Sequence, residues 1–96
     1  MTDISVKIDD DTMLRHALRH IYSNLSNNDF EAICSILSKS ENRYIRDAVS
    51  LAISDTNHPD FIPLLEEMIK KETVSNLRED MEYVLSAILA DIGDTD

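Results

Sequence analysis

The side chains of this sequence best suited to metal binding or nucleophilic chemistry are three histidines and one cysteine. His16 and His20 are four positions apart, a helical spacing that can hold one metal ion between two imidazoles. Arg15 and Arg19 stand directly beside them, and their positive charges oppose the binding of a cation. We therefore expect a solvated basic face here rather than a metal site.

His58 and Cys34 lack the partners that catalysis needs. His58 precedes Pro59 in a predicted turn, which favours a turn residue over a general base. Cys34 lies among apolar neighbours such as Ile33 and Ile36, a pattern typical of a buried structural thiol. Because it is the only cysteine, neither an intramolecular disulfide nor a cysteine-based zinc site can form.

Motifs for catalysis or cofactor binding are also missing. The sequence contains no glycine-rich phosphate loop, no nucleophile elbow and no calcium-binding loop. Its carboxylates lie mostly at the chain ends and on predicted helix surfaces, whereas paired acid–base catalysis needs them in a cleft. We expect a protein that is not an enzyme and that binds no metal or cofactor.

The charge of the chain narrows the range of partners. Its 96 residues include 9 basic and 19 acidic side chains, which gives a net charge of −10. Phosphate contacts need a surplus of lysine and arginine, so direct binding to nucleic acid is disfavoured. No stretch approaches the roughly 20 apolar residues that span a bilayer, and the first residues resemble no signal peptide. We expect a cytoplasmic protein without membrane contact. Its expected partner is a basic protein, and the alternative is that it has no charged partner.

The helices that carry these side chains follow from hydrophobic periodicity. One glycine and two prolines are too few for the tight turns of a small β-sandwich, so an all-α fold is predicted. Apolar residues recur at helical spacing and predict five helices. Four of them cover about 12–25, 29–39, 59–72 and 77–92. The third in chain order is capped by Ser40 and includes Tyr44 to Ile53.

The two ends of the chain are expected to be irregular. We predict a single domain over 1–96, in which 1–10 is extended or disordered, because Ile4, Val6 and Ile8 alternate as in a short strand. Gly93 should end the last helix, since glycine accepts the left-handed conformation at a helix end, and 94–96 should be a frayed tail. The predicted core is Leu18, Ile21, Phe30, Ile33, Ala48, Val49, Ala52, Phe61, Leu65, Val84 and Ile88.

An internal repeat organises the helices in pairs. An offset of 31 residues aligns Leu14-Arg15 with Ile45-Arg46 and Asp29-Phe30 with Asp60-Phe61, and an offset of 32 brings Leu77-Arg78 onto the same start. The third unit keeps only its first helix. A period of this length is typical of stacked repeats, in which each unit buries its apolar face against its neighbours.

The segment from Ile45 to Leu65 resembles a HEAT-like repeat of the short kind. Its first helix opens with Ile45-Arg46-Asp47-Ala48-Val49, and Asn57-His58-Pro59-Asp60-Phe61 leads into the second. The first unit lacks the prolines, and the third has Asp80 where a small residue is expected. The resemblance implies a short right-handed α-solenoid of two and a half units; a five-helix bundle whose pairs are similar by chance is the alternative.

The last predicted helix is the candidate partner-binding element. Residues 77–96 carry a net charge of −5, half of the total, whereas residues 13–25 carry +2. Glu79, Glu82, Tyr83 and Ser86 form a stripe opposite the packing face, with Asp80 at its edge. Glu66 and Glu67 would join this surface if the two last helices lie side by side. The stripe acts as a solubilising cap, as a binding surface, or as both.

We expect a small acidic helical-repeat protein without catalytic residues to be a protein-binding module. In its general properties the chain resembles the small bacterial immunity proteins that neutralise toxins. This resemblance implies that the partner is a basic nuclease toxin domain, inhibited when its active cleft is covered. Two alternatives stay open: an adaptor or assembly subunit that uses the helix grooves, and an acidic DNA-mimic inhibitor.

Overall fold

The computed structural model describes the backbone of residues 4–94 and the side chains of residues 12–93. Five α-helices and one 3₁₀ helix follow one another: α1 Ile4–Tyr22, α2 Asn27–Leu37, α3 Arg43–Thr56, η1 Pro59–Phe61, α4 Ile62–Lys71 and α5 Ser75–Asp94. No strand occurs within the described range. The prediction of an all-α fold is confirmed.

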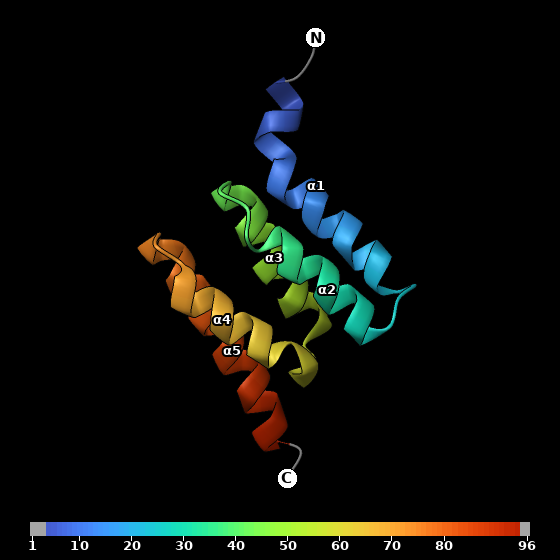
Figure 1. Cartoon of the computed structure of the whole chain (residues 1–96), viewed down its shortest axis with the longest axis vertical. Coiled ribbons are helices and arrows are strands. Elements are labelled where there is room, and N and C mark those ends of the chain that lie inside the picture. The colour runs from blue at the N-terminus through green and yellow to red at the C-terminus, as the bar shows by residue number, and fades with distance from the viewer. Residues whose placement is uncertain (1–3, 95–96) are drawn as a thin grey trace.

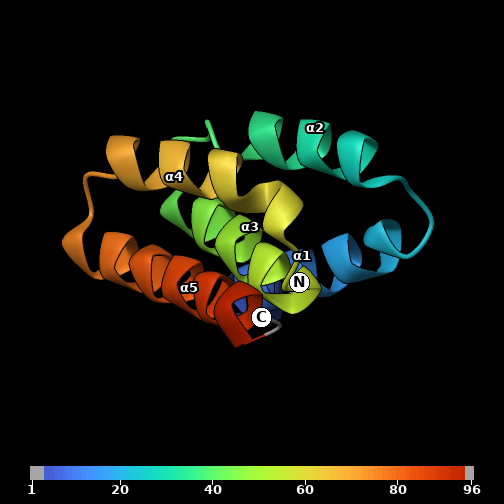
Figure 2. The ribbon, with the colours of Figure 1, turned by 90° about the horizontal axis from the view of Figure 1, so that it is seen from below.

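The helices are arranged in two layers (Figure 2). One layer contains α1, α3 and α5, with α3 between the other two, and the second layer contains α2 and α4. The molecule measures 53 × 32 × 21 Å, and its smallest extent corresponds to two helix layers about 10 Å apart. The two outer helices of the three-helix layer, α1 and α5, therefore each have one side without a neighbouring helix in that layer (Figure 1).

Short polar side chains begin the second and third helices. Ser26 caps α2, and its hydroxyl accepts a hydrogen bond from the backbone N–H of Asp29 at 3.2 Å. The cap of α3 is Asn42, whose side-chain oxygen accepts from the N–H of Tyr44 at 2.9 Å. The prediction that Ser40 caps α3 is wrong, because its hydroxyl accepts instead from the N–H of Asn42 in the preceding turn.

The turn before α4 confirms the structural interpretation of His58. Asn57 ends α3 in the left-handed conformation, with φ of 49°. The Nδ1 atom of His58 then accepts a hydrogen bond from the backbone N–H of Asp60 at 3.1 Å, and Pro59 occupies the first turn of η1. Proline loses nothing there, because the first amides of a helix have no partner within the helix.

The first helix begins earlier than predicted. α1 already includes Ile4, so the expectation of an extended or disordered segment is wrong for residues 4–10, while residues 1–3 lie outside the described range. A helix that has already formed its first turns extends at little cost per residue, because nucleation is the unfavourable step. This local advantage overrides the alternating pattern of Ile4, Val6 and Ile8.

The last helix also extends past its predicted end. Gly93 lies inside α5, which ends at Asp94, and Gly93 does not adopt a positive φ. Its environment is open, since a methyl group on its Cα would meet no neighbouring element within 4 Å, so nothing forces the chain to turn at this residue. The remaining residues of the predicted frayed tail, 95–96, lie outside the described range.

Three aromatic rings form the centre of the core. Phe30 and Phe61 are fully buried and meet edge to face with ring centroids 5.6 Å apart. Tyr22 contacts both, at 4.8 Å from Phe30 and 6.1 Å from Phe61. Edge-to-face pairs of this kind add about 0.5–1.5 kcal/mol to the stabilisation from burial alone. The cluster joins α1, α2 and η1.

Residues that the repeat makes equivalent are neighbours in space. Phe30 and Phe61 are separated by the offset of 31, and the side chains of Asn27 and His58, separated by the same offset, approach to 3.4 Å. Asn27 also donates to Asp60 at 2.9 Å. The two turns that precede α2 and α4 therefore lie side by side.

Most of the predicted core is buried, with two departures. Leu18, Phe30, Ala48, Val49, Ala52, Phe61, Leu65, Val84 and Ile88 are buried as predicted, and Ile33 is half-buried. Ile21 remains 37% exposed, so its assignment to the core is wrong. It lies on an outer helix, beside the stripe of Leu14, Leu18 and Tyr22 that packs against the core.

Replacing Phe61 by alanine should lower the free energy of unfolding by about 3 kcal/mol or more, because it removes a fully buried ring and leaves a cavity between Phe30 and Tyr22. Urea unfolding followed by circular dichroism measures the change. Tyr44→Ala is the matched control, since that ring is exposed and should matter little. A loss below about 1 kcal/mol for Phe61→Ala would contradict its central place in the core.

Candidate functional site

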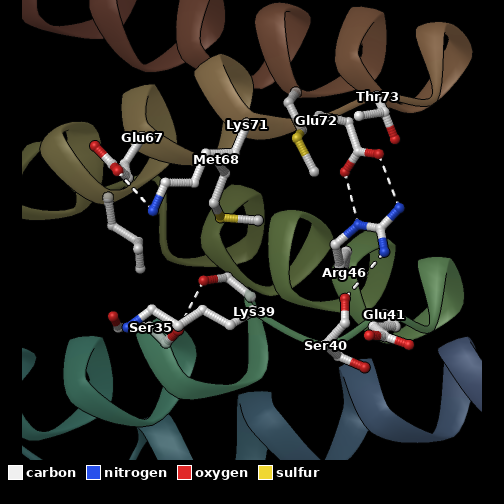
Figure 3. A pocket seen from close by; sticks show the side chains of 13 residues that line it. Ser35, Lys39, Ser40, Glu41, Arg46, Glu67, Met68, Lys71, Glu72 and Thr73 are labelled. Atoms are coloured by element: carbon white, nitrogen blue, oxygen red, sulfur yellow. Dashed lines mark hydrogen bonds and ion pairs between the residues drawn. The ribbon is translucent and has the colours of Figure 1, made fainter.

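A cavity of about 350 Å³ opens between α2 and α4 (Figure 3). Leu64, Met68 and Met81 supply the apolar part of its lining. Its polar lining comes from the end of α2, the following turn, α3 and the end of α4: Ser35, Ser38, Lys39, Ser40, Glu41, Arg46, Glu67, Lys71, Glu72 and Thr73. Positive and negative side chains alternate around it, so the cavity has no strong preference for either sign of charge.

A buried ion pair closes one end of this cavity. The Nε and Nη2 atoms of Arg46 donate to the two carboxylate oxygens of Glu72 at 2.8 and 2.9 Å, the bidentate geometry that arginine forms with a carboxylate. The side chain of Glu72 is almost completely buried. Arg46 also donates from Nη1 to the carbonyl of Ser40 at 3.0 Å. The pair therefore ties α3 to the end of α4.

Hydrogen bonding explains why Glu72 stays ionised in this place. The Arg46 guanidinium lowers the pKa of Glu72, burial opposes this shift, and the backbone N–H of Val74 contributes a further bond at 3.1 Å. Arg78, the repeat equivalent of Arg46, donates to the carbonyl of Glu72 at 3.3 Å. The sequence pattern identified the repeated arginines but did not predict the role of Glu72. An arginine on the buried side of a helix needs a counter-ion, and this requirement could have pointed to Glu72.

The acidic stripe on α5 is exposed, as predicted. Tyr83 is 76% exposed, and Glu79, Asp80 and Glu82 around it are exposed as well. Within the described part of the chain, no lysine, arginine or histidine forms an ion pair with these three carboxylates. We call Glu79, Asp80, Glu82 and Tyr83 the acidic face of α5.

The two predicted residues from α4 lie in different surroundings. Glu66 is exposed, on a helix that packs against α5. Glu67 instead borders the cavity between α2 and α4, where its carboxylate lies 2.9 Å from the Nζ atom of Lys71 (Figure 3). The lysine lowers the pKa of Glu67 through this bond. None of the residues of the acidic face lines that cavity, so Glu67 does not share its surroundings.

The basic face predicted for α1 is partly neutralised. Arg15 donates from Nη2 and Nε to the carboxylate of Asp55 on α3, at 2.7 and 2.9 Å, so it forms an ion pair that the sequence did not predict, while its side chain stays 37% exposed. Arg19 approaches the same carboxylate at 3.9 Å, whereas His16 and His20 are exposed. Bonding to Arg15 lowers the pKa of Asp55. Among the described side chains, no group of three potential metal ligands is found.

Cys34 is fully buried in the core, which confirms the prediction of a buried thiol. Burial raises the pKa of this thiol to about 12, with a smaller contribution from Glu31. The reactive thiolate is therefore scarce at neutral pH, as expected for a structural cysteine.

Comparison with known proteins assigns no relative: no family model, no curated protein and no solved structure matches this chain. Within residues 4–94, no helix has both the length and the apolar character to cross a membrane.

Replacing Glu72 by alanine should lower the free energy of unfolding by about 3 kcal/mol, because Arg46 then loses its counter-ion in a mostly buried position. The double variant Arg46→Met/Glu72→Leu, which buries no charge, should lose much less. Urea unfolding of Glu72→Ala measures this loss, and urea unfolding of Glu72→Leu, Arg46→Met and the double variant measures the coupling. Losses that simply add would contradict a direct bond between the two side chains.

Acid should weaken the fold through Glu72 and Asp55, whose pKa values are both lowered by bonded arginines. Each carboxylate has a lower pKa in the folded than in the unfolded chain, so its contribution is present above the unfolded value of about 4 and is lost as the pH falls below it. The Tm should drop below about pH 5. The drop should be smaller in Arg46→Met/Glu72→Leu, and equal drops would refute a role for Glu72.

Proposed function

We propose that this chain is a non-catalytic protein-binding module built as a short α-solenoid of HEAT-like repeats. The two-layer arrangement supports this proposal, with the first helix of each unit in one layer and the second helices in the other (Figure 2). It is further supported by the contacts between equivalent residues, Phe30 with Phe61 and Asn27 with His58. Repeat folds of this kind offer extended surfaces for proteins.

The partner that we propose is a basic protein surface that contacts α5. The observation that carries this is the acidic face, where three carboxylates without an ion-pair partner in the described range surround a tyrosine that is 76% exposed. Tyrosine is enriched among interface residues that dominate affinity, and its ring accepts a lysine or arginine side chain. The carboxylates would speed association with a positively charged partner and disfavour acidic proteins.

An immunity protein against a nuclease toxin is the specific function that we propose. A nuclease binds its substrate through lysine and arginine contacts to phosphates, so its active cleft is a basic surface. The acidic face of α5 complements such a cleft, and a chain bound there would exclude the nucleic acid. Inhibition would then arise from competition for the same positive charges, without any chemistry on the inhibitor.

An adaptor or assembly subunit is the second candidate. It is favoured by the 350 Å³ cavity between α2 and α4, whose mixed lining suits a partner of either charge. An acidic DNA mimic is less consistent with the charge distribution, because carboxylates on α3 and at the end of α4 are used to pair Arg15 and Arg46 inside the protein.

Reversing two charges on the acidic face tests the proposed function. Glu79→Lys/Glu82→Lys should slow association with the native basic partner at least tenfold at low salt and weaken the salt dependence of the rate, because both carboxylates contribute to steering. The partner is first captured from native lysate on the immobilised chain and identified by mass spectrometry. Stopped-flow or biosensor kinetics then gives the association rate, and a nuclease assay shows whether the chain inhibits it.

Glu31→Lys/Glu41→Lys is the control, since it changes the net charge equally but lies away from the acidic face, on α2 and in the turn that borders the cavity between α2 and α4. We expect this variant to keep more of the association rate than the first. Equal rates for the two variants would show that only net charge matters, and unchanged binding by Glu79→Lys/Glu82→Lys would leave the acidic face as a solubilising cap. Circular dichroism should report native helicity for both variants.

A further inference from the structure

Six charged side chains line the cavity between α2 and α4, three of each sign. Four of them form two ion pairs, Arg46 with Glu72 and Lys71 with Glu67. The opposite charges of each pair largely cancel at the distance of a ligand. The charge preference of the cavity therefore depends on the other two residues.

Lys39 and Glu41 are the two charged lining residues without an ion-pair partner among the side chains of residues 12–93. Both are exposed. They lie on different sides of the cavity (Figure 3): Lys39 follows the end of α2 and helps to lower the pKa of Glu67, whereas Glu41 lies in the turn before α3, on the side of Arg46. One side of the cavity thus offers an unpaired positive charge, and the other offers an unpaired negative charge.

The inner lining of the cavity is apolar. Met68 points from α4 into the space between α4 and α2 (Figure 3), and the buried Leu64 lines the same cavity. A methionine side chain is flexible and polarizable, so it adapts to the shape of an apolar group. The hydroxyls of Ser35 and Thr73, which also line the cavity, can donate to or accept from a peptide backbone.

The size of the cavity limits what it can hold. Its volume of about 350 Å³ is at the lower end of the range of roughly 300–1,000 Å³ that is usual for ligand sites. A site of this size has room for a small part of a larger molecule, such as one apolar side chain with the backbone beside it. The three positive and three negative lining residues cancel, so a complementary ligand has no net charge.

We propose that this cavity binds an extended peptide segment of another protein, in which one apolar residue lies between an acidic and a basic residue. Side chains at alternate positions of an extended peptide point to the same side, so three residues spaced by two would face the cavity together. The apolar side chain would pack against Met68. The acidic side chain would approach Lys39, and the basic one would approach Glu41.

Three synthetic peptides test this site. They share one length and a central leucine, and the residues two positions before and after it are glutamate and lysine, two glutamates, or two lysines. Fluorescence anisotropy with the full chain should show that the mixed peptide binds at least threefold more tightly than either of the others. Lys39→Glu should shift the preference to the peptide with two lysines, and Glu41→Lys should shift it to the peptide with two glutamates. Both residues are exposed, so the fold should tolerate these changes.

Matched controls make the same charge changes elsewhere. Lys70→Glu on α4 and Glu31→Lys on α2 alter residues that do not line the cavity, so both variants should keep the preference of the wild type. Ser35→Phe places a ring at the cavity without changing any charge. It should weaken the mixed peptide at least tenfold, while circular dichroism reports native helicity.

The site would be refuted by equal binding of the three peptides to the wild type, or by no binding of any of them. It would also be refuted if Lys39→Glu and Glu41→Lys kept the preference of the wild type, or if a natively helical Ser35→Phe bound the mixed peptide as tightly. None of these results bears on the proposed function, because no residue of the acidic face of α5 lines the cavity. That function fails separately, when reversal at Glu79 and Glu82 leaves the basic partner bound as before.

Discussion

The buried carboxylate of Glu72 ties the last third of the chain to α3. It receives two bonds from Arg46 on α3 and one from the backbone of Val74, while the carbonyl of Glu72 receives one from Arg78 on α5. These contacts fix the turn between α4 and α5 against α3. The acidic face of α5 follows this turn, and the buried row of α5, formed by Leu77, Met81, Val84 and Ile88, holds the rest of the helix against the core. Burying a carboxylate is costly, and bidentate pairing is what makes it tolerable here.

The acidic residues of the chain fall into two groups, those that pair with arginines between helices and those that are exposed on α5. Asp55 and Glu72 each pair with an arginine that belongs to the repeat pattern, and they join helices that are far apart in sequence. Glu79, Asp80 and Glu82 have no such partner among the side chains of residues 12–93 and lie on the outer side of the last helix. A stacked repeat needs a polar end to stay soluble, and the same exposed charge can attract a positively charged protein.

Exposed apolar residues add a second component to the proposed binding surface. The exposed apolar residues Tyr83, Leu89 and Ile92 all lie on α5. Like α1, this helix is at the edge of its layer and has a neighbour on one side only in that layer (Figure 2). Charge alone favours fast encounter with many basic proteins, whereas apolar contacts at defined spacing select one shape. The combination on one helix is the physical basis for expecting a specific partner.

The sequence by itself predicted five helices and the outward stripe of α5, because both follow from the spacing of apolar residues along one element, but it missed the first turns of α1. The equivalence of Phe30 and Phe61 could likewise be seen in the repeat, and the two rings meet in the core. Tertiary structure decided which flank of each helix is covered. Ile21 is exposed because no described neighbour covers its side of α1. Arg15 bonds to Asp55, and Glu72 is buried against Arg46, because residues 26 or more positions away in the sequence pack beside them. Periodicity reports that a helix has an apolar side, but the limits of that side depend on what packs against it.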